Sequence, residues 1–214
     1  MSSYYYLVAQ LPFLIYGQSI PMGSEVFKAM ARKAMNSAEA AVLDYCTLDP
    51  APPGAEENDA AYTNPPPHTL SPLINHWMEW ERTLRLNLAH GRAQKLNRAP
   101  GDIPIAPELP VDAVKTANTA LFMESPLEAE LFLDKARWDA IESFLDYNIF
   151  SENSVYAYLL KLLLMERRAM FVAEEGFTEY KGLYAAIMEN AGSVTVAGFT
   201  PGHMSDMTEP GEPK

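Results

Sequence analysis

Apolar residues recur every three or four positions along most of this chain, which is the period of an α-helix. Ser24 is placed as an N-cap before a first run of this kind, and Asn36 is a candidate break that divides the run into two short helices. A second run follows Ser71 and Pro72, a serine cap with a proline in the first turn, and it extends to Arg98. The pattern therefore predicts helices joined by loops.

The clearest pair of helices lies in residues 125–175. Ser125 and Glu128 have the spacing of a capping box, in which a serine and a glutamate side chain each bond a backbone amide of the first turn. The apolar stripe of the first helix includes Asp134, and that of the second includes Glu166. The second helix is apolar on two faces, which predicts a central position covered from two sides.

Proline-rich segments at residues 49–71 and 100–110 interrupt the helical pattern and predict loops. Around them the hydrophobic periodicity is continuous enough for one bundle-like helical domain over residues 1–192. After residue 192 the periodicity is lost, and glycine, proline and small polar residues predominate. We therefore predict a mainly α-helical domain followed by a flexible tail over residues 193–214.

A weak internal repeat accompanies this layout. A capped helix is followed by a longer leucine-rich helix with an embedded Glu-Arg pair, first at positions 81–82 and again at positions 166–167. We interpret the domain as two helical-hairpin repeats, at about residues 24–98 and 112–190.

Residues 4–9 are the one candidate for a short N-terminal strand. Such a strand would need a neighbour to pair its backbone, and residues 194–199 are the segment available for that role. A helix or an extended arm is the alternative for residues 4–9, and the sequence favours that alternative.

The charge balance narrows the range of partners. The chain has 28 acidic and 16 basic residues, a net charge of −12, whereas nucleic acids and anionic lipids attract basic surfaces. We therefore expect no nucleic-acid binding. No run of eighteen apolar residues occurs, so we also expect no direct insertion into a membrane. The single cysteine, Cys46, excludes an internal disulfide and fits the reducing cytoplasm.

The charges are also unevenly distributed. Residues 82–98 hold five basic side chains and no acidic one, whereas residues 102–152 hold eleven acidic and three basic side chains. The two stretches could attract each other within the fold, or each could meet a different partner.

No motif for catalysis or cofactor binding occurs. The four histidines are scattered without the spacing of a metal site, and the chain has neither a Gly-x-Ser-x-Gly nucleophile motif nor a glycine-rich phosphate loop. We therefore predict no catalytic residue, no metal and no cofactor from motifs.

Asp134 and Glu166 remain as ionisable residues on apolar stripes. An ion pair with arginine between helices, an acid–base pair in a cleft, and an acceptor for a partner's arginine are all compatible with this placement. The cations available to them are Arg85, Arg137, Arg167 and Arg168. Arg92, in the basic stretch, is a further candidate for an ion pair or a partner contact, and Trp77 and Trp80 are candidates for core packing or a partner contact.

Several segments resemble one bacterial protein family. They are YYYLVAQLPFL near the N-terminus, WERTLRLNLAHGRAQKL in the middle, and PLEAELFLDKARWDAIESFL with VYAYLLKLLLMERR after it. Together they are similar, over residues 4–185, to an uncharacterised family whose genes lie among those of the V-type (A/V-type) ATPase. The helical layout also resembles, as a pattern, the central-stalk component of that ATPase that forms a socket between the rotor ring and the central shaft, although two repeats stand here where three are usual.

The resemblance implies a non-catalytic accessory or central-stalk-like subunit that acts through protein–protein contacts with other V-type ATPase subunits. Such a protein would be cytoplasmic and peripheral to the inner membrane through the complex. The helix over residues 82–98 and the block 125–175 would then be contact surfaces. Two alternatives stay open: an enzyme or small-ligand binder that uses Asp134 and Glu166 in a cleft between helices, and an assembly factor or adaptor for the ATPase.

Overall fold

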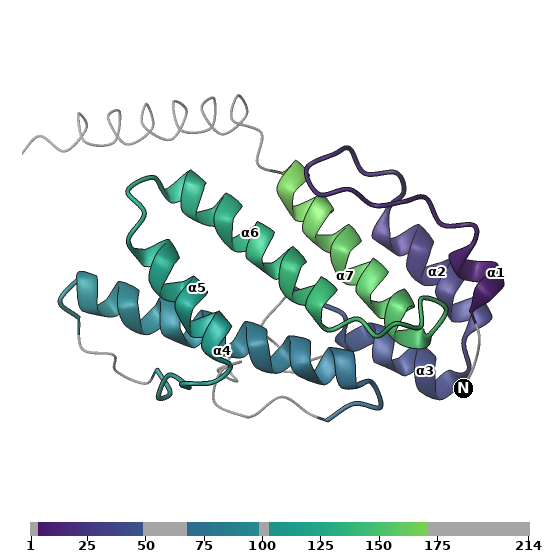
Figure 1. The fold of residues 1–214 in the computed structure, drawn as a ribbon, viewed down its shortest axis with the longest axis horizontal. Coiled ribbons are helices and arrows are strands. Elements are labelled where there is room, and N and C mark those ends of the chain that lie inside the picture. Colours follow the sequence, from purple (N-terminus) through teal and green to yellow (C-terminus); the bar gives the residue numbers. More distant parts are fainter. Residues whose placement is uncertain (1–3, 49–67, 99–102, 171–214) are drawn as a thin grey trace, which may run out of the picture. The chain divides into compact units, whose positions relative to one another are not determined.

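All regular elements in the part of the chain that the structure describes are helices, and that part contains no strand (Figure 1). The computed structural model describes residues 4–48, 68–98 and 103–170, all within the unit Met1–Met170. The mainly α-helical fold expected from the sequence is therefore confirmed. The elements are α1 (Tyr5–Val8), α2 (Ser24–Ala34), α3 (Ser37–Val42), a 3-10 turn (Leu43–Tyr45), α4 (Pro72–Lys95), α5 (Val111–Leu121), α6 (Pro126–Ser143) and α7 (Glu152–Ala169).

The predicted tail over residues 193–214 and the end of the predicted second repeat, residues 171–190, lie outside the described residues. The two-repeat organisation therefore stays a prediction.

The N-terminal segment is a helix, so the strand alternative for residues 4–9 is wrong. The amides of Val8 and Ala9 bond the carbonyls of Tyr4 and Tyr5 at 2.9 Å, which satisfies the backbone locally. Leu7 is buried, and no strand lies beside this segment in the described part of the chain.

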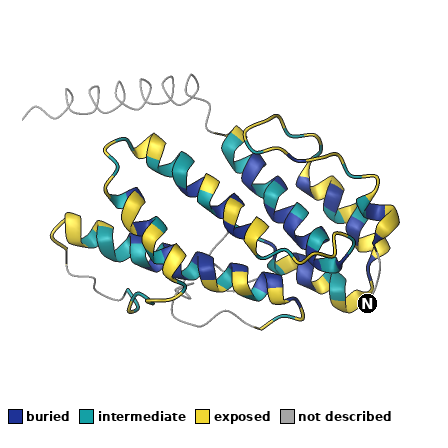
Figure 2. Ribbon diagram, viewed as in Figure 1, coloured by how far each residue is buried: buried dark blue, intermediate teal, exposed yellow. Residues whose placement is uncertain are grey.

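Helix α7 lies at the centre of the unit, as its two apolar faces predicted. It packs against α2, α4 and α6, and Figure 2 shows buried positions along its length and in the middle of α4. It runs antiparallel to α6, because Lys161, in the middle of α7, pairs with Glu142 near the end of α6, whereas Arg167, in the last turn of α7, pairs with Glu130 near the start of α6. Helix α7 is therefore a shared packing partner of α2, α4 and α6.

Residues 104–109, which come before α5, run back along α4. Thr83, Asn87 and His90, on one face of α4, bond the carbonyls of Leu109, Pro107 and Pro104 at 2.7, 3.0 and 2.6 Å. The chain then reverses, and α5 follows α4 in parallel. The parallel direction is shown by the bond from Trp80 to Asp112 at the start of α5 and by the contact of Gly91 with Leu121 at its end.

Gly91 allows this close approach of the two helices. A Cβ atom at position 91 would lie 2.1 Å from Cδ1 of Leu121, so any other residue would force Leu121 to move. The helix continues past Gly91 to Lys95. Glycine in a helix costs about 1 kcal/mol relative to alanine, but at position 91 it leaves room for the side chain of Leu121 in α5.

The N-terminus of α2 is capped from α7. Ser24 was predicted as the N-cap, but Gly23 occupies that position and makes no side-chain cap. Instead, Glu166 accepts hydrogen bonds from the backbone N–H and the hydroxyl of Ser24, each at 2.7 Å. The carboxylate thus satisfies a free amide and meets the positive end of the helix dipole.

Replacement of Glu166 by alanine should therefore destabilise the chain by about 1–2 kcal/mol. Ser24→Ala should cost less, because the backbone N–H of residue 24 can still donate to Glu166. Urea unfolding followed by circular dichroism measures both. Asp139→Ala is the control, because among the described residues Asp139 forms a salt bridge with the exposed Lys135 alone. An effect of Glu166→Ala no larger than that of the control would contradict the capping role.

Candidate functional site

A network of buried charges joins α4 to α6. Arg137 of α6 holds the carboxylate of Glu81 with two nitrogens, Nε to Oε2 at 3.0 Å and Nη2 to Oε1 at 3.1 Å. Arg85, one turn after Glu81 on α4, donates to the same carboxylate at 2.5 Å. Arg137 also donates to Asp134, one turn earlier on α6, at 3.2 Å. The network thus consists of an acid and an arginine from each helix.

The spacing of these residues explains how the network forms. Glu81 and Arg85 are separated by four positions, and Asp134 and Arg137 by three, so each pair lies on one face of its helix. Packing of α4 against α6 brings the two pairs together and removes them from water. Only 4% of the Arg137 side chain and 1% of the Asp134 side chain are exposed. At such burial each charge depends on its partner for solvation.

The two acids respond to burial in opposite ways. Burial opposes ionisation of Glu81, but the guanidinium groups of Arg137 and Arg85 outweigh that effect and hold its pKa below the usual range. Burial raises the pKa of Asp134, and Arg167 and Arg137 offset only part of the increase. Its Oδ2 atom is buried with no hydrogen-bond partner. The ionised form of Glu81 is therefore stabilised within the network, whereas the ionised form of Asp134 is destabilised by burial.

A cleft of about 220 Å³ opens beside this network between α4, α6 and α7. Its charged lining residues are Arg85, Arg92, Glu130, Arg137 and Arg167. Glu130 lies between two arginines and accepts from Arg92 at 3.3 Å and from Arg167 at 3.2 Å. Nε of Arg167 also lies 3.9 Å from Asp134. Arg167 therefore connects the outer pair to the buried network.

Among the residues predicted from the sequence, Arg85, Arg92 and Arg167 line the cleft, and Asp134 lies in the buried network beside it. Glu166 and Asp134 share no partner that the structure describes, because the Glu166 carboxylate accepts from Ser24, whereas Asp134 accepts from Arg137. Arg168 lies apart from the network, with its guanidinium 4.7 Å from the ring centre of Tyr16. An acid–base pair of Asp134 with Glu166 is therefore not what the geometry presents.

Trp77 and Trp80 belong to the core rather than to a partner surface. Both side chains are almost fully buried, with their rings stacked 6.2 Å apart. The indole N–H of Trp80 donates to Asp112 at 2.6 Å, and that of Trp77 bonds the Thr47 carbonyl at 3.4 Å. Of the two alternatives for these tryptophans, core packing is therefore the one that the structure shows, and the partner contact is not supported, because their apolar area is already buried within the unit.

Glu81 and Glu130 were not among the predicted site residues. Glu81 lies four positions after Trp77 and four before Arg85, so it shares the apolar stripe of α4 in the same way as Asp134 shares that of α6. That placement could have identified it. Glu130 gave no such signal, because it lies on a partly exposed side of α6, and its role depends on where α4 and α7 come to lie.

Two further features of the described residues bear on the type of site. No three His, Cys, Asp or Glu side chains among them are grouped so that they could hold a metal ion. Of the helices that the structure describes, none is both long and apolar enough to cross a membrane. The cleft is therefore defined by its arginines and their partner carboxylates.

Comparison with known proteins did not identify a relative. A scan against models of protein families, a search of curated proteins and a search of solved structures each gave no match. The family resemblance stated above therefore rests on the sequence segments quoted for it.

Glu81 and Asp134 should differ in the sign of their effect on stability. The lowered pKa of Glu81 means that its ionised form stabilises the fold above the unfolded pKa of about 4.3, and that this contribution is lost as the pH falls through the folded pKa. The raised pKa of Asp134 means that its ionised form costs stability at neutral pH, a cost that disappears as the pH falls below about 3.9.

At pH 7, Glu81→Gln should therefore lower the free energy of unfolding, while Asp134→Asn should leave it unchanged or raise it. The difference for Asp134→Asn should shrink as the pH falls toward about 4, whereas that for Glu81→Gln should persist there and shrink only at lower pH, as the pH falls through the lowered folded pKa of Glu81. Urea titrations across this range measure the effects. Equal destabilisation by the two substitutions at pH 7 would contradict the assignment of Glu81 and Asp134 to opposite roles.

Proposed function

We propose that the chain is a non-catalytic accessory or central-stalk-like subunit of a V-type ATPase, active through protein–protein contacts on the cytoplasmic side of the inner membrane. The observation that carries the contact function is a group of exposed apolar side chains at the end of the unit formed by α1 and the connection between α6 and α7. The ATPase as partner follows from the sequence resemblance.

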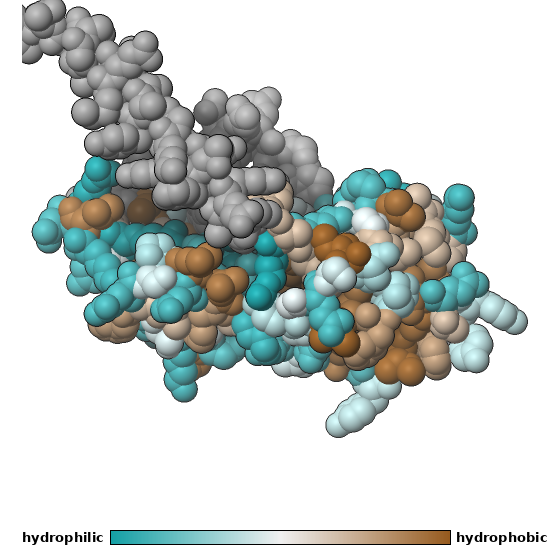
Figure 3. Space-filling model, turned by 90° about the horizontal axis from the view of Figure 1, so that it is seen from above, coloured by the Kyte–Doolittle hydropathy of each residue, from teal (hydrophilic) through white to brown (hydrophobic). Residues whose placement is uncertain are grey.

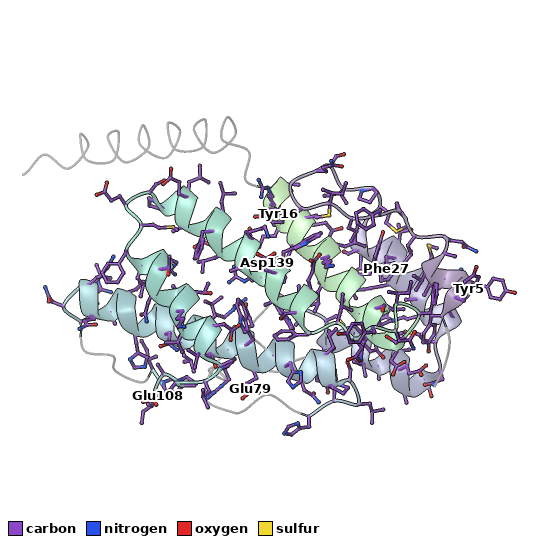
Figure 4. All side chains as sticks on the ribbon, in the orientation of Figure 1. Tyr5, Tyr16, Phe27, Glu79, Glu108 and Asp139 are labelled. Carbon is purple, nitrogen blue, oxygen red and sulfur yellow. The ribbon has the colours of Figure 1, made fainter. Side chains whose placement is uncertain are left out.

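The exposed group, named here the aromatic end, consists of Tyr5, Tyr6, Tyr147 and Ile149. Tyr6 is 82% exposed, and Tyr147 is fully exposed. Figure 4 shows Tyr5 pointing away from the helices at the end of the unit where Figure 1 places α1. The hydrophobic side chains that Figure 3 shows near that end are of other residue types, because tyrosine is weakly hydrophilic on the hydropathy scale of that figure. Exposed tyrosines of this kind are typical of protein interfaces.

The backbone makes the aromatic end one surface rather than scattered residues. The amide of Tyr4 donates to the Phe150 carbonyl at 2.9 Å, which joins α1 to the connection between α6 and α7. The Tyr5 ring lies 4.9 Å from that of Phe150 and 5.9 Å from that of Tyr6. The rings of Tyr5 and Phe150, which lie far apart in the sequence, are therefore in contact.

The buried charges support a mechanical rather than a chemical role. Acids of α6 and α7 that approach the core or the cleft are bound by arginines or by a helix terminus, as Glu130, Asp134 and Glu166 are. Ion pairs of this kind contribute little net stability, but they can fix the register in which helices pack. A bundle held in one register is suited to transmit force between the proteins that it contacts.

The test is recovery of partners by a tagged chain from its own host under gentle conditions. The parent chain should recover V-type ATPase subunits, and Tyr6→Ser with Tyr147→Ser should reduce that recovery about tenfold, the loss of about 1.4 kcal/mol of binding free energy. Phe122→Ser is the matched control, because Phe122 is 85% exposed on the connection between α5 and α6. Recovery of no ATPase subunit by the parent chain would refute the proposal.

The same experiment separates a stable subunit from an assembly factor or adaptor. A stable component should be present in the purified ATPase complex in a fixed ratio to the other subunits. A chain that is found only with immature complexes would instead support the transient role.

A further inference from the structure

The cleft between α4, α6 and α7 has more positive than negative charge, and the excess lies at its mouth. Deeper in, Arg85 and Arg137 face Glu81 and Asp134, so the buried network is balanced. At the mouth, two arginines, Arg92 and Arg167, share one carboxylate, that of Glu130. One guanidinium charge there has no counter-charge among the described residues.

The two mouth arginines also have unused hydrogen-bond donors. Each guanidinium carries five N–H groups, yet within the described part of the chain Arg92 makes one hydrogen bond and Arg167 makes one, both to Glu130 through Nη2. The Nε of Arg167 lies 3.9 Å from Asp134, too far for a hydrogen bond. Most donors at the mouth are therefore free to bind another acceptor.

Glu130 is held weakly enough to yield to a better ligand. The side chain of Arg92 is 60% exposed and that of Glu130 is 31% exposed, and ion pairs at such exposure are worth about 0–1 kcal/mol. A phosphate group offers up to two negative charges and three acceptor oxygens, in a geometry that arginine forks match. Exchange of Glu130 for phosphate would therefore improve the charge balance and use more donors.

The walls of the cleft favour such a ligand as well. Leu88 and Leu133 line it beside the arginines, and apolar walls strengthen the field that charged groups exert within a cleft. The net charge of −12 on the whole chain does not cancel this attraction, because charges more than about 8–10 Å away are largely screened at physiological ionic strength.

We propose that this cleft binds a phosphate group, either as inorganic phosphate or as the phosphoryl end of a small phosphomonoester, with Arg92 and Arg167 as its principal ligands. Arg137 and Arg85 form the floor and remain held by Glu81. The site is independent of the aromatic end, so it stands or falls separately from the ATPase proposal.

Direct titration tests the site better than thermal stabilisation, because phosphate stabilises many proteins by exclusion from their surfaces. Isothermal titration calorimetry of the full chain, at constant ionic strength set with chloride, should show saturable binding of inorganic phosphate or of glycerol 3-phosphate. The ligand with the lower Kd shows whether the cleft prefers free phosphate or the phosphoryl end of a phosphomonoester.

Three single substitutions give the expected pattern. Arg92→Gln and Arg167→Gln should each weaken binding about tenfold, whereas Glu130→Gln should tighten it several-fold, because a competing carboxylate is removed. Arg32→Gln is the matched control, since Arg32 is an exposed arginine paired with the carboxylate of Asp44 at 2.6 Å, in α2 and outside the cleft. It should bind as the parent chain does.

A gain of affinity in Glu130→Gln cannot come from lost stability, so it separates a binding role from a structural one. Absence of saturable binding for both ligands would overturn the proposal. The proposal would also be overturned if both single variants, Arg92→Gln and Arg167→Gln, bound phosphate as the parent chain does. It would equally be overturned if Arg32→Gln lost as much affinity as those two variants.

Discussion

The fold depends most on the pair that Arg137 makes with Glu81. Its two parallel hydrogen bonds fix α6 against α4 in both position and rotation, because a planar guanidinium meets a carboxylate in only a narrow range of orientations. Arg85 and Asp134 complete the charges around this pair. An apolar contact between the same helices could slide by a turn at small cost, whereas a slip here would leave a buried charge without a partner.

The rest of the unit follows from that constraint. With α6 fixed on α4, α7 can pair its last turn with Glu130 and still place Glu166 at the start of α2. The segment after α4 is held by three side chains of one α4 face, so α5 also lies where α4 dictates. What remains outside this framework is the aromatic end and the mouth of the arginine cleft. At the first of these the described unit exposes aromatic side chains, and at the second it has an arginine in excess of the nearby carboxylates.

The local structure could be predicted from the sequence, and the long-range structure could not. The break at Asn36 is real, because its side chain and that of Glu39 form a capping box at the start of α3. Ser71 and Ser125 cap α4 and α6 as predicted, but at α6 only the serine half of the predicted capping box is present, with Ser125 accepting from the Glu128 amide. Each of these features depends on residues within three or four positions of one another. The central place of α7 was also evident, because a helix apolar on two faces must be covered on both.

The site was only partly visible for the same reason. The ionisable residues on the stripes were recognisable one by one, but their partners are 56 positions apart for Glu81 and Arg137 and 142 for Ser24 and Glu166. Periodicity gives the face on which a residue lies and not the helix that it meets. Nor does it reveal that α5 runs parallel to α4, since that direction depends on how residues 103–109, which have no regular structure, lie along α4.

The most direct test of the constraint between α4 and α6 is a double-mutant cycle with Glu81→Gln, Arg137→Met and the two together, measured by urea unfolding at pH 7. We expect a coupling free energy of about 2–3 kcal/mol between the two residues, near the upper end of what contacting side chains show. A coupling below about 0.5 kcal/mol, the level seen for independent sites, would contradict this constraint and would mean that α4 and α6 are held together by apolar packing alone.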